Sequence, residues 1–256
     1  MSKLPKEHKF IDLSDYGRPF ARVIANALKN TTFTPIHVTI AFIIAGIFAI
    51  YCIVYSHYWL AAFFLILKSI LDAADGELAR VKQKPSYTGR YLDSVADILL
   101  NALFFIAIGY IASTPIWICI GAFLGLQLQG TLYNYYYVIL RNKFDGDTTS
   151  RVFENKTPIA LPGEKQKHVN ILFGMYKVLY GAFDKTIYAL DSNAHKGAAL
   201  PKWFMTSVST FGLGFQLLLI AILLVLNLKS YILPFFLGYT LMVLVFIAIR
   251  KIFYKS

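Results

Sequence analysis

Six long apolar stretches dominate this sequence and limit what it can fold into. They cover residues 34–55, 58–80, 90–113, 115–141, 203–228 and 231–253. Each has the roughly 20 residues that an α-helix needs to cross about 30 Å of hydrocarbon. With 57% hydrophobic and only 15% charged residues, the 256-residue chain carries more apolar surface than a soluble protein can bury. We therefore expect an all-α membrane protein with six transmembrane helices.

The basic residues are distributed unevenly around these stretches. Six spans place both termini on one side of the membrane, and all of the 25 Lys and Arg residues except Lys68 and Lys229 lie on that side. Cytoplasmic loops carry an excess of Lys and Arg, so we expect both termini in the cytoplasm. The net charge of +11 then reflects topology and attraction to anionic membrane lipids. We expect no nucleic-acid partner.

The layout divides the chain into four segments. Residues 1–33 form a cytoplasmic N-terminal segment, 34–142 a four-helix half, 143–202 a cytoplasmic or interfacial connection, and 203–256 the last two transmembrane helices and the tail. The N-terminal segment lacks the apolar core of a signal peptide. Apolar residues recur in it at helical spacing, which predicts an amphipathic helix on the membrane surface. These residues are Phe20, Val23, Ile24 and Leu28.

Other features of the spans have simple interpretations. The two cysteines, Cys52 and Cys119, both lie inside spans, so neither a disulfide nor a zinc site is expected. A run of tyrosines near the end of the fourth span is typical of an interfacial aromatic belt. It comprises Tyr133, Tyr135, Tyr136 and Tyr137. In the connection, residues 169–190 are either a seventh span or, in better agreement with their charges, an amphipathic surface helix.

Acidic residues are concentrated where the second span ends and the third begins. Asp72 and Asp75 are three residues apart and Asp93 and Asp97 four apart, so each pair shares one helix face. The two helices form a hairpin, which brings the four carboxylates together at the cytoplasmic end. Carboxylates this close repel one another unless cations separate them, and Mg²⁺ prefers carboxylate and phosphate oxygens. We expect two Mg²⁺ or Mn²⁺ ions that clamp a phosphoryl group.

The residues around these aspartates complete a known pattern. Small residues leave the helix surface bare for a ligand, and basic residues can neutralise phosphate oxygens. The pattern reads Asp72-x2-Asp75-Gly76-x2-Ala79-Arg80-x8-Gly89-x3-Asp93-x3-Asp97. It resembles the signature of the CDP-alcohol phosphatidyltransferases at all eight fixed positions. The resemblance extends to the span layout and the amphipathic N-terminal helix, but weakens beyond the fourth span.

The resemblance implies a reaction and a role for each residue. The hydroxyl of a lipid or polar alcohol attacks a CDP-alcohol donor, and CMP leaves. Asp72, Asp75, Asp93 and Asp97 would hold the metals, and Asp97 would also act as the catalytic base. The nucleotide diphosphate would contact Gly76, Ala79, Arg80 and Gly89. The resemblance further suggests a homodimer.

A second family element, Pro-Asn-x-x-Thr, is incomplete here. Pro35 and Thr39 match it and are expected near the nucleotide, but Ile36 stands where asparagine is usual. His37 is expected to be an interface residue, with compensation for the missing amide as the alternative. Ser86, in the loop between the aspartate helices, is a weaker phosphate candidate.

Several alternatives stay open. The donor could be CDP-diacylglycerol, which the short chain favours, or CDP-choline or CDP-ethanolamine with diacylglycerol as acceptor. More distant alternatives are an intramembrane prenyltransferase and a cation transporter. Glu77 is expected to be solvated. Lys68, four residues before Asp72, is either a membrane-embedded salt-bridge partner or a site residue. The basic connection is a membrane-surface element or an acceptor-recognition element.

Overall fold

The computed structural model describes residues 4, 6–144, 156–197 and 199–254. All regular structure in this part of the chain is helical, which confirms the expected all-α class. Short 3-10 helices η1 (Lys6–His8), η2 (Leu13–Asp15), η3 (Ala194–Lys196) and η4 (Ser209–Phe211) interrupt the α-helices. The α-helices are α1 (Arg18–Leu28), α2 (Pro35–Val54), α3 (Tyr58–Val81), α4 (Tyr87–Ile111), α5 (Ile116–Lys143), α6 (Gln166–Leu190), α7 (Lys202–Val208), α8 (Leu213–Val225), α9 (Lys229–Tyr239) and α10 (Leu241–Phe253).

Several of these helices mark the chain as an integral membrane protein. In the described residues, α2, α4, α5 and the stretch formed by α9 and α10 are long and apolar enough to cross a membrane, and the bent pair of α7–η4 with α8 is a fifth candidate. The expected second span coincides with α3, which has 24 residues but carries Lys68, Asp72 and Asp75. These charges keep it outside the candidates, so the number of six spans is not confirmed and stays a prediction.

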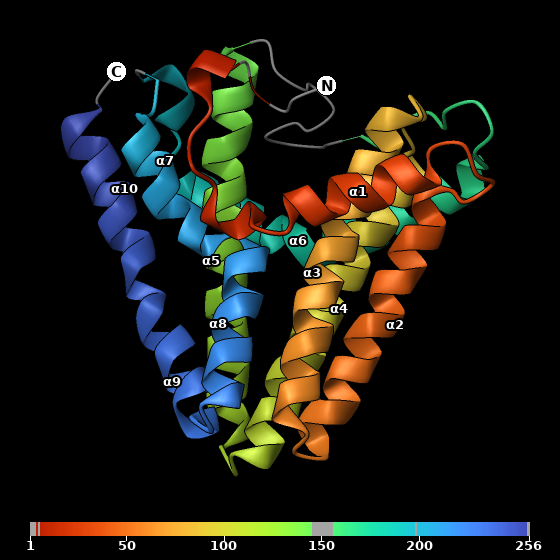
Figure 1. The fold of residues 1–256 in the computed structure, drawn as a ribbon. Coiled ribbons are helices and arrows are strands. Elements are labelled where there is room, and N and C mark those ends of the chain that lie inside the picture. The colour runs from red at the N-terminus through yellow and green to blue at the C-terminus, as the bar shows by residue number, and fades with distance from the viewer. Residues whose placement is uncertain (1–3, 5, 145–155, 198, 255–256) are drawn as a thin grey trace.

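The helices are arranged in two arms (Figure 1). Helices α2, α3 and α4 form one arm, and α5, α8, α9 and α10 form the other. The arms approach each other at the end that holds the α4–α5 and α8–α9 turns and diverge toward the end where both chain termini lie. The start of the described chain and the end of α10 therefore lie at the same end of the molecule, and the cytoplasmic placement of the termini stays a prediction.

Tight turns join successive helices, both within an arm and between the two arms. Ser56, Ser113 and Asn227 have positive φ angles of 61°, 51° and 56°. A residue in the left-handed conformation ends a helix and reverses the chain. Pro115 follows one of these turns and precedes α5, because proline cannot continue a helix but is tolerated at its start. Short turns therefore connect these apolar helices.

One expected helix is broken. The apolar stretch 203–228 is not a continuous span, because α7 and η4 meet α8 at an angle of 55° around Gly212. The N-terminal segment occupies this bend, where the Leu13 N–H donates a hydrogen bond to Ser209 Oγ at 2.9 Å. A Cβ atom on Gly212 or Gly214 would overlap Ser14. The two glycines therefore allow η2 to pack against the start of α8.

The N-terminal helix α1 lies across α3. Ala21 and Ala25 are buried in this contact, and their small side chains allow the two helices to approach closely. Phe20 and Val23 stay exposed, with relative accessibilities of 63% and 68%. Their apolar side chains suit a membrane surface, but the amphipathic surface role stays a prediction.

The tyrosines of α5 do not form the expected aromatic belt. Tyr136 is fully buried, and its hydroxyl donates to Asp191 Oδ2 at 2.7 Å. Tyr135 donates to the Asp191 carbonyl at 2.9 Å, and Tyr133 donates to Asp12 Oδ2 at 2.5 Å. Buried tyrosine hydroxyls need hydrogen-bond partners, and segments that lie far away in the sequence supply them here.

Candidate active site

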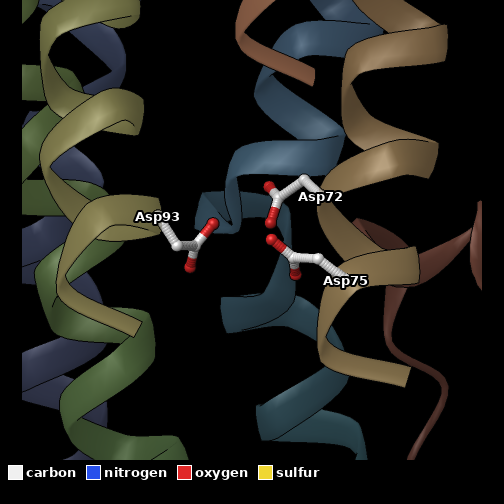
Figure 2. Close-up of side chains that lie close together, drawn as sticks. All are labelled: Asp72, Asp75 and Asp93. Carbon is white, nitrogen blue, oxygen red and sulfur yellow. The ribbon is translucent and has the colours of Figure 1, made fainter. Parts of the chain in front are cut away.

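The α3–α4 hairpin brings the acidic side chains together as expected. Asp72 and Asp75 project from α3 toward Asp93 on α4 (Figure 2). One carboxylate oxygen of each residue lies within 4.8 Å of the others. The three-residue spacing on α3 places both of its carboxylates on the face that meets α4, because three residues are nearly one helical turn. We refer to Asp72, Asp75 and Asp93 as the carboxylate trio.

The trio suits a divalent cation. Oδ1 of Asp93 is shielded from solvent and has no hydrogen-bond partner in the described part of the chain. A buried carboxylate oxygen without a partner is costly, and a metal ion supplies the missing interaction. Three carboxylates from two helices leave room for substrate phosphates in the coordination sphere of Mg²⁺ or Mn²⁺. The donor set therefore fits the expected kind of metal.

Thr39 lies beside the trio. Its hydroxyl donates a hydrogen bond to Asp75 Oδ2 at 2.7 Å, and both side chains are buried. Thr39 is on α2, so this bond fixes the carboxylate of α3 from a third helix. A hydrogen bond to a metal-binding carboxylate orients it. The sequence predicted a nucleotide contact for Thr39. It did not predict that Thr39 orients the Asp75 carboxylate.

Next to the carboxylate trio, Lys68 forms an ion pair with Asp97, the fourth aspartate of the signature. The Lys68 Nζ atom lies 3.3 Å from Asp72 Oδ2 and also contacts Asp97 Oδ1. The Lys68 side chain is fully buried. Asp97 is not in the group of carboxylates whose oxygens lie within 4.8 Å of one another. Both sequence interpretations of Lys68 therefore apply, since it forms a buried ion pair and lies within the candidate site.

Arg80 lies over Gly76 at the end of α3. A Cβ on Gly76 would lie 3.6 Å from the Arg80 guanidinium nitrogens, which is ordinary van der Waals contact. Arg80 Nη2 is 3.2 Å from Glu77 Oε1, and Arg18 of the N-terminal segment contacts the same carboxylate. The expectation that Glu77 is solvated was wrong, because two arginines cover it and it is only 8% exposed. Ala79 stays partly exposed on the same helix.

The start of α2 lies next to the start of α4. A Cβ on Gly89 would be 3.7 Å from Ile36 Cγ1, so the residue that replaces the usual asparagine is at the site. Pro35 is in the first turn of α2. His37 Nδ1 accepts a hydrogen bond from the Thr34 N–H at 2.9 Å, so His37 caps its own helix. This geometry supports a structural role for His37 rather than compensation for the missing amide.

Glu164 is a residue near the site that sequence reasoning missed. Its Oε1 atom accepts hydrogen bonds of 2.7 Å from Ser86 Oγ and from the Thr88 N–H, and its Oε2 atom accepts one of 3.2 Å from the Tyr87 N–H. Partial burial raises the pKa of Glu164, but the bonds from Thr88 and Ser86 outweigh it and lower the pKa. Ser86 also caps α4 by accepting from the Gly89 N–H at 2.8 Å. One glutamate in a Pro- and Gly-containing loop carries no sequence signal for this contact.

Helix α6 belongs to the connection and packs on α4. Tyr91 is buried against Phe173, with 5.4 Å between ring centroids, and Tyr180 donates a hydrogen bond to the Ser94 carbonyl at 2.9 Å. The region 169–190 is thus a helix that packs on the arm formed by α2, α3 and α4. It is not among the candidate membrane spans of the described residues. Residues 145–155 of the connection lie outside the described residues.

The fold and the site define an all-helical membrane protein with a carboxylate site at one end of a helical hairpin. A sequence model of the CDP-alcohol phosphatidyltransferase family matches residues 32–161, half of the chain. The chain belongs to this family of transferases. It is also 33% identical, over 122 residues, to the bifunctional IPC transferase and DIPP synthase of Thermococcus kodakarensis. The match covers 46% of this chain and 27% of that protein, so the chain spans about a quarter of that relative.

Proposed function

We propose that this protein transfers the phospho-alcohol group of a CDP-alcohol to an acceptor hydroxyl and releases CMP. The carboxylate trio carries this proposal, because Asp72, Asp75 and Asp93 of the family signature have oxygens within 4.8 Å of one another. A bound Mg²⁺ or Mn²⁺ ion would polarise the diphosphate and stabilise the charge that develops on the leaving CMP. The rest of the chemistry falls to side chains of this chain.

The diphosphate is proposed to bind along the end of α3 and the start of α4. Arg80 would donate charge-assisted hydrogen bonds to phosphate oxygens, and Glu77 holds its guanidinium in place from below. Gly76, Ala79 and Gly89 would let the nucleotide approach the backbone. Pro35 and Thr39 would lie near the cytidine, with Thr39 also orienting Asp75. The Ser86 hydroxyl would reach a phosphate only if it left Glu164.

Asp97 is proposed as the general base. It would take the proton of the acceptor hydroxyl while the acceptor oxygen bonds to the phosphorus beside the donor alcohol. The bond between that phosphorus and the CMP oxygen breaks in the same displacement, and CMP leaves with the electron pair. A carboxylate beside cations is a suitable base for a hydroxyl that becomes more acidic as it attacks.

CDP-diacylglycerol is the donor we propose, with a polar alcohol as acceptor. The basic connection would suit an acceptor that carries a phosphate, because Lys165 and Lys167 immediately follow Glu164. The relative from Thermococcus kodakarensis is likewise named a transferase. The alternative is a CDP-choline or CDP-ethanolamine donor with diacylglycerol as acceptor.

The surroundings of the reaction are also proposals. The excess of Lys and Arg near the termini supports a cytoplasmic site in a membrane with anionic lipids. A homodimer is proposed from the family resemblance. A prenyltransferase or a cation transporter is disfavoured, because the chain belongs to the CDP-alcohol phosphatidyltransferase family.

A donor-by-acceptor grid tests the function. Purified protein in lipid nanodiscs with Mg²⁺ is given each CDP-alcohol with glycerol phosphate, serine, inositol, inositol phosphate or diacylglycerol, and CMP release is measured. We expect release with CDP-diacylglycerol and one polar acceptor, and loss of release with EDTA or in Asp97→Asn. Absence of CMP in every combination, with the protein folded, would contradict the proposal.

A further inference from the structure

Lys68 is the most unusual charged residue in the site. It lies one turn before Asp72 on α3, and its relative accessibility is 0%. Its Nζ atom lies over the Phe42 ring on α2, 4.8 Å from the ring centre, a cation–π contact. A buried ammonium persists only where opposite charges compensate it. Asp97 and Asp72 provide that compensation.

These contacts divide the four signature aspartates into two groups. In one group, Thr39 orients Asp75, and Asp93 Oδ1 has no hydrogen-bond partner in the described residues. In the other, Asp97 is neutralised by Lys68. Asp72 belongs to both, since it contacts Lys68 and is also part of the trio. The chain therefore supplies one cation, the Lys68 ammonium, to the second group. Among the described residues, the trio lacks a counter-charge of its own apart from the Lys68 contact with Asp72.

We infer that the Lys68 ammonium takes the place of one of the two divalent ions predicted from the sequence, so that the site binds a single ion through Asp72, Asp75 and Asp93. The inference rests on the proposed function for the role of that ion. A second divalent ion that bridged Asp72 and Asp97 would lie beside the Lys68 charge, and like charges at such a distance repel strongly in a buried site.

A permanent ammonium would perform one part of the missing ion's work. It would hold Asp97 near the trio and balance one carboxylate charge, so that Asp97 stays available as the base. It would not contact the substrate phosphates, because its Nζ atom is already occupied by contacts with Asp72, Asp97 and the Phe42 ring. Lys68 is thus a positioning residue for Asp97, and the diphosphate depends on the single ion and on basic side chains such as Arg80.

Metal stoichiometry tests the inference. Mn²⁺ is titrated into purified protein in nanodiscs and counted from the electron paramagnetic resonance signal of the free ion, with and without CMP. We expect one Mn²⁺ per chain in the wild type and in Lys68→Arg, and two in Lys68→Met, where the neutral side chain has a similar length. Lys177→Met makes the same chemical change at an exposed position of α6 and is expected to bind one ion.

Two aspartate variants sharpen the test. Asp93→Asn should weaken Mn²⁺ binding by about 100-fold or more, because it removes a ligand. Asp97→Asn should change the affinity by less than about 3-fold if Lys68, and not an ion, holds Asp97; a loss of about 10-fold or more would assign Asp97 as a ligand and overturn the inference. Two ions in the wild type would also overturn it, whether or not Lys68→Met folds.

The outcomes are separate from those of the proposed function. Wild-type protein that releases CMP and binds two ions would retain the function and reject the role of Lys68. Protein that binds one ion but releases no CMP from any donor would reject the function and retain the stoichiometry. Lys68→Met that folds, as judged by circular dichroism, and still binds one ion would contradict the inference.

Discussion

The cluster of aspartates in one arm and the buried Asp191, which packs against the other arm, are compensated in opposite ways. In the α3–α4 hairpin, Lys68 pairs with two of the four aspartates, Asp72 and Asp97, and Asp93 Oδ1 has no hydrogen-bond partner in the described residues. In the other arm, Asp191 is contacted by Arg250 through both carboxylate oxygens. The Tyr136 hydroxyl adds a hydrogen bond of 2.7 Å to the same group.

The difference lies in the source of the compensating charge. Arg250 on α10 pairs with both oxygens of Asp191, and Tyr136 on α5 donates a hydrogen bond to Oδ2, so α5, α10 and the end of α6 are joined from within the chain. The hairpin cluster keeps an excess of negative charge that the described residues do not balance. A buried charge that is paired inside the chain supports the fold, whereas one left unpaired indicates a ligand.

The largest expected effect comes from Asp93→Asn. Activity should fall on the order of 10³-fold or more, because the substitution removes a metal ligand and the charge stabilisation that depends on it. Metal-free protein should be as stable as the wild type or more stable, since one repelling carboxylate is gone and the new amide can donate to its neighbours. CMP release and SDS-induced unfolding in EDTA measure the two effects. A large loss of stability without metal would contradict the comparison.

Asp191→Asn should show the opposite behaviour. The substitution leaves the buried Arg250 guanidinium without its counter-charge, so the free energy of unfolding should fall by about 3 kcal/mol or more. The remaining folded protein should bind Mn²⁺ with unchanged affinity, because Asp191 is outside the carboxylate trio. SDS-induced unfolding and Mn²⁺ titration provide the measurements. If Mn²⁺ affinity fell while stability did not, the two clusters would not have separate roles.

Gly214→Ala tests how strongly the N-terminal segment joins the arms. A Cβ on Gly214 would overlap the Ser14 carbonyl oxygen, and backbone atoms cannot move aside cheaply. We expect a loss of about 1–3 kcal/mol in the free energy of unfolding. Gly238→Ala in α9 is the matched control, because a Cβ there meets nothing within 4 Å and alanine favours a helix. Equal effects of the two substitutions would show that η2 does not depend on this close contact.

The smallest expected effect concerns Glu164 and pH. Its pKa is lowered from the ordinary value of 4.5, so the ionised carboxylate stabilises the fold above that pH and the contribution is lost as the pH falls through the folded-state pKa. Glu164→Gln should cost about 1 kcal/mol at pH 7, because the amide oxygen keeps some bonds but loses the charge. The difference between wild type and variant should shrink below pH 4.5, as thermal unfolding at several pH values would show. A constant difference would disprove the assigned role of the charge.

Much of the site follows from local spacing. The three-residue step from Asp72 to Asp75 and a short hairpin were enough to predict that Asp93 would meet them, and the helical period requires it. Contacts between distant segments were not predictable. Thr39 bonds to Asp75 from α2, and Glu164 caps α4 from a loop that is more than 70 residues away in the chain. No local period relates such pairs.

The same reasoning explains where the structure departs from what composition alone suggests. The apolar stretch 203–228 has the composition of a span, but Gly212 and the docking of Ser14 bend it by 55°. The tyrosines of α5 have the composition of an aromatic belt, but Asp12 and Asp191 bind their hydroxyls. In both cases a partner from another part of the chain overrides what composition indicates.

The amino-acid sequence alone was sufficient to predict the class of protein and the grouping of its carboxylates. Apolar length predicts helices in a membrane, and the spacing of the aspartates on them predicts a cation-binding face, because both depend on the helical repeat alone. Which of the buried carboxylates are paired with basic side chains of the same chain became clear from the tertiary structure. Lys68 reaches Asp97 on the next helix and Arg250 reaches Asp191 across the second arm, because packing brings these distant residues within ion-pair distance.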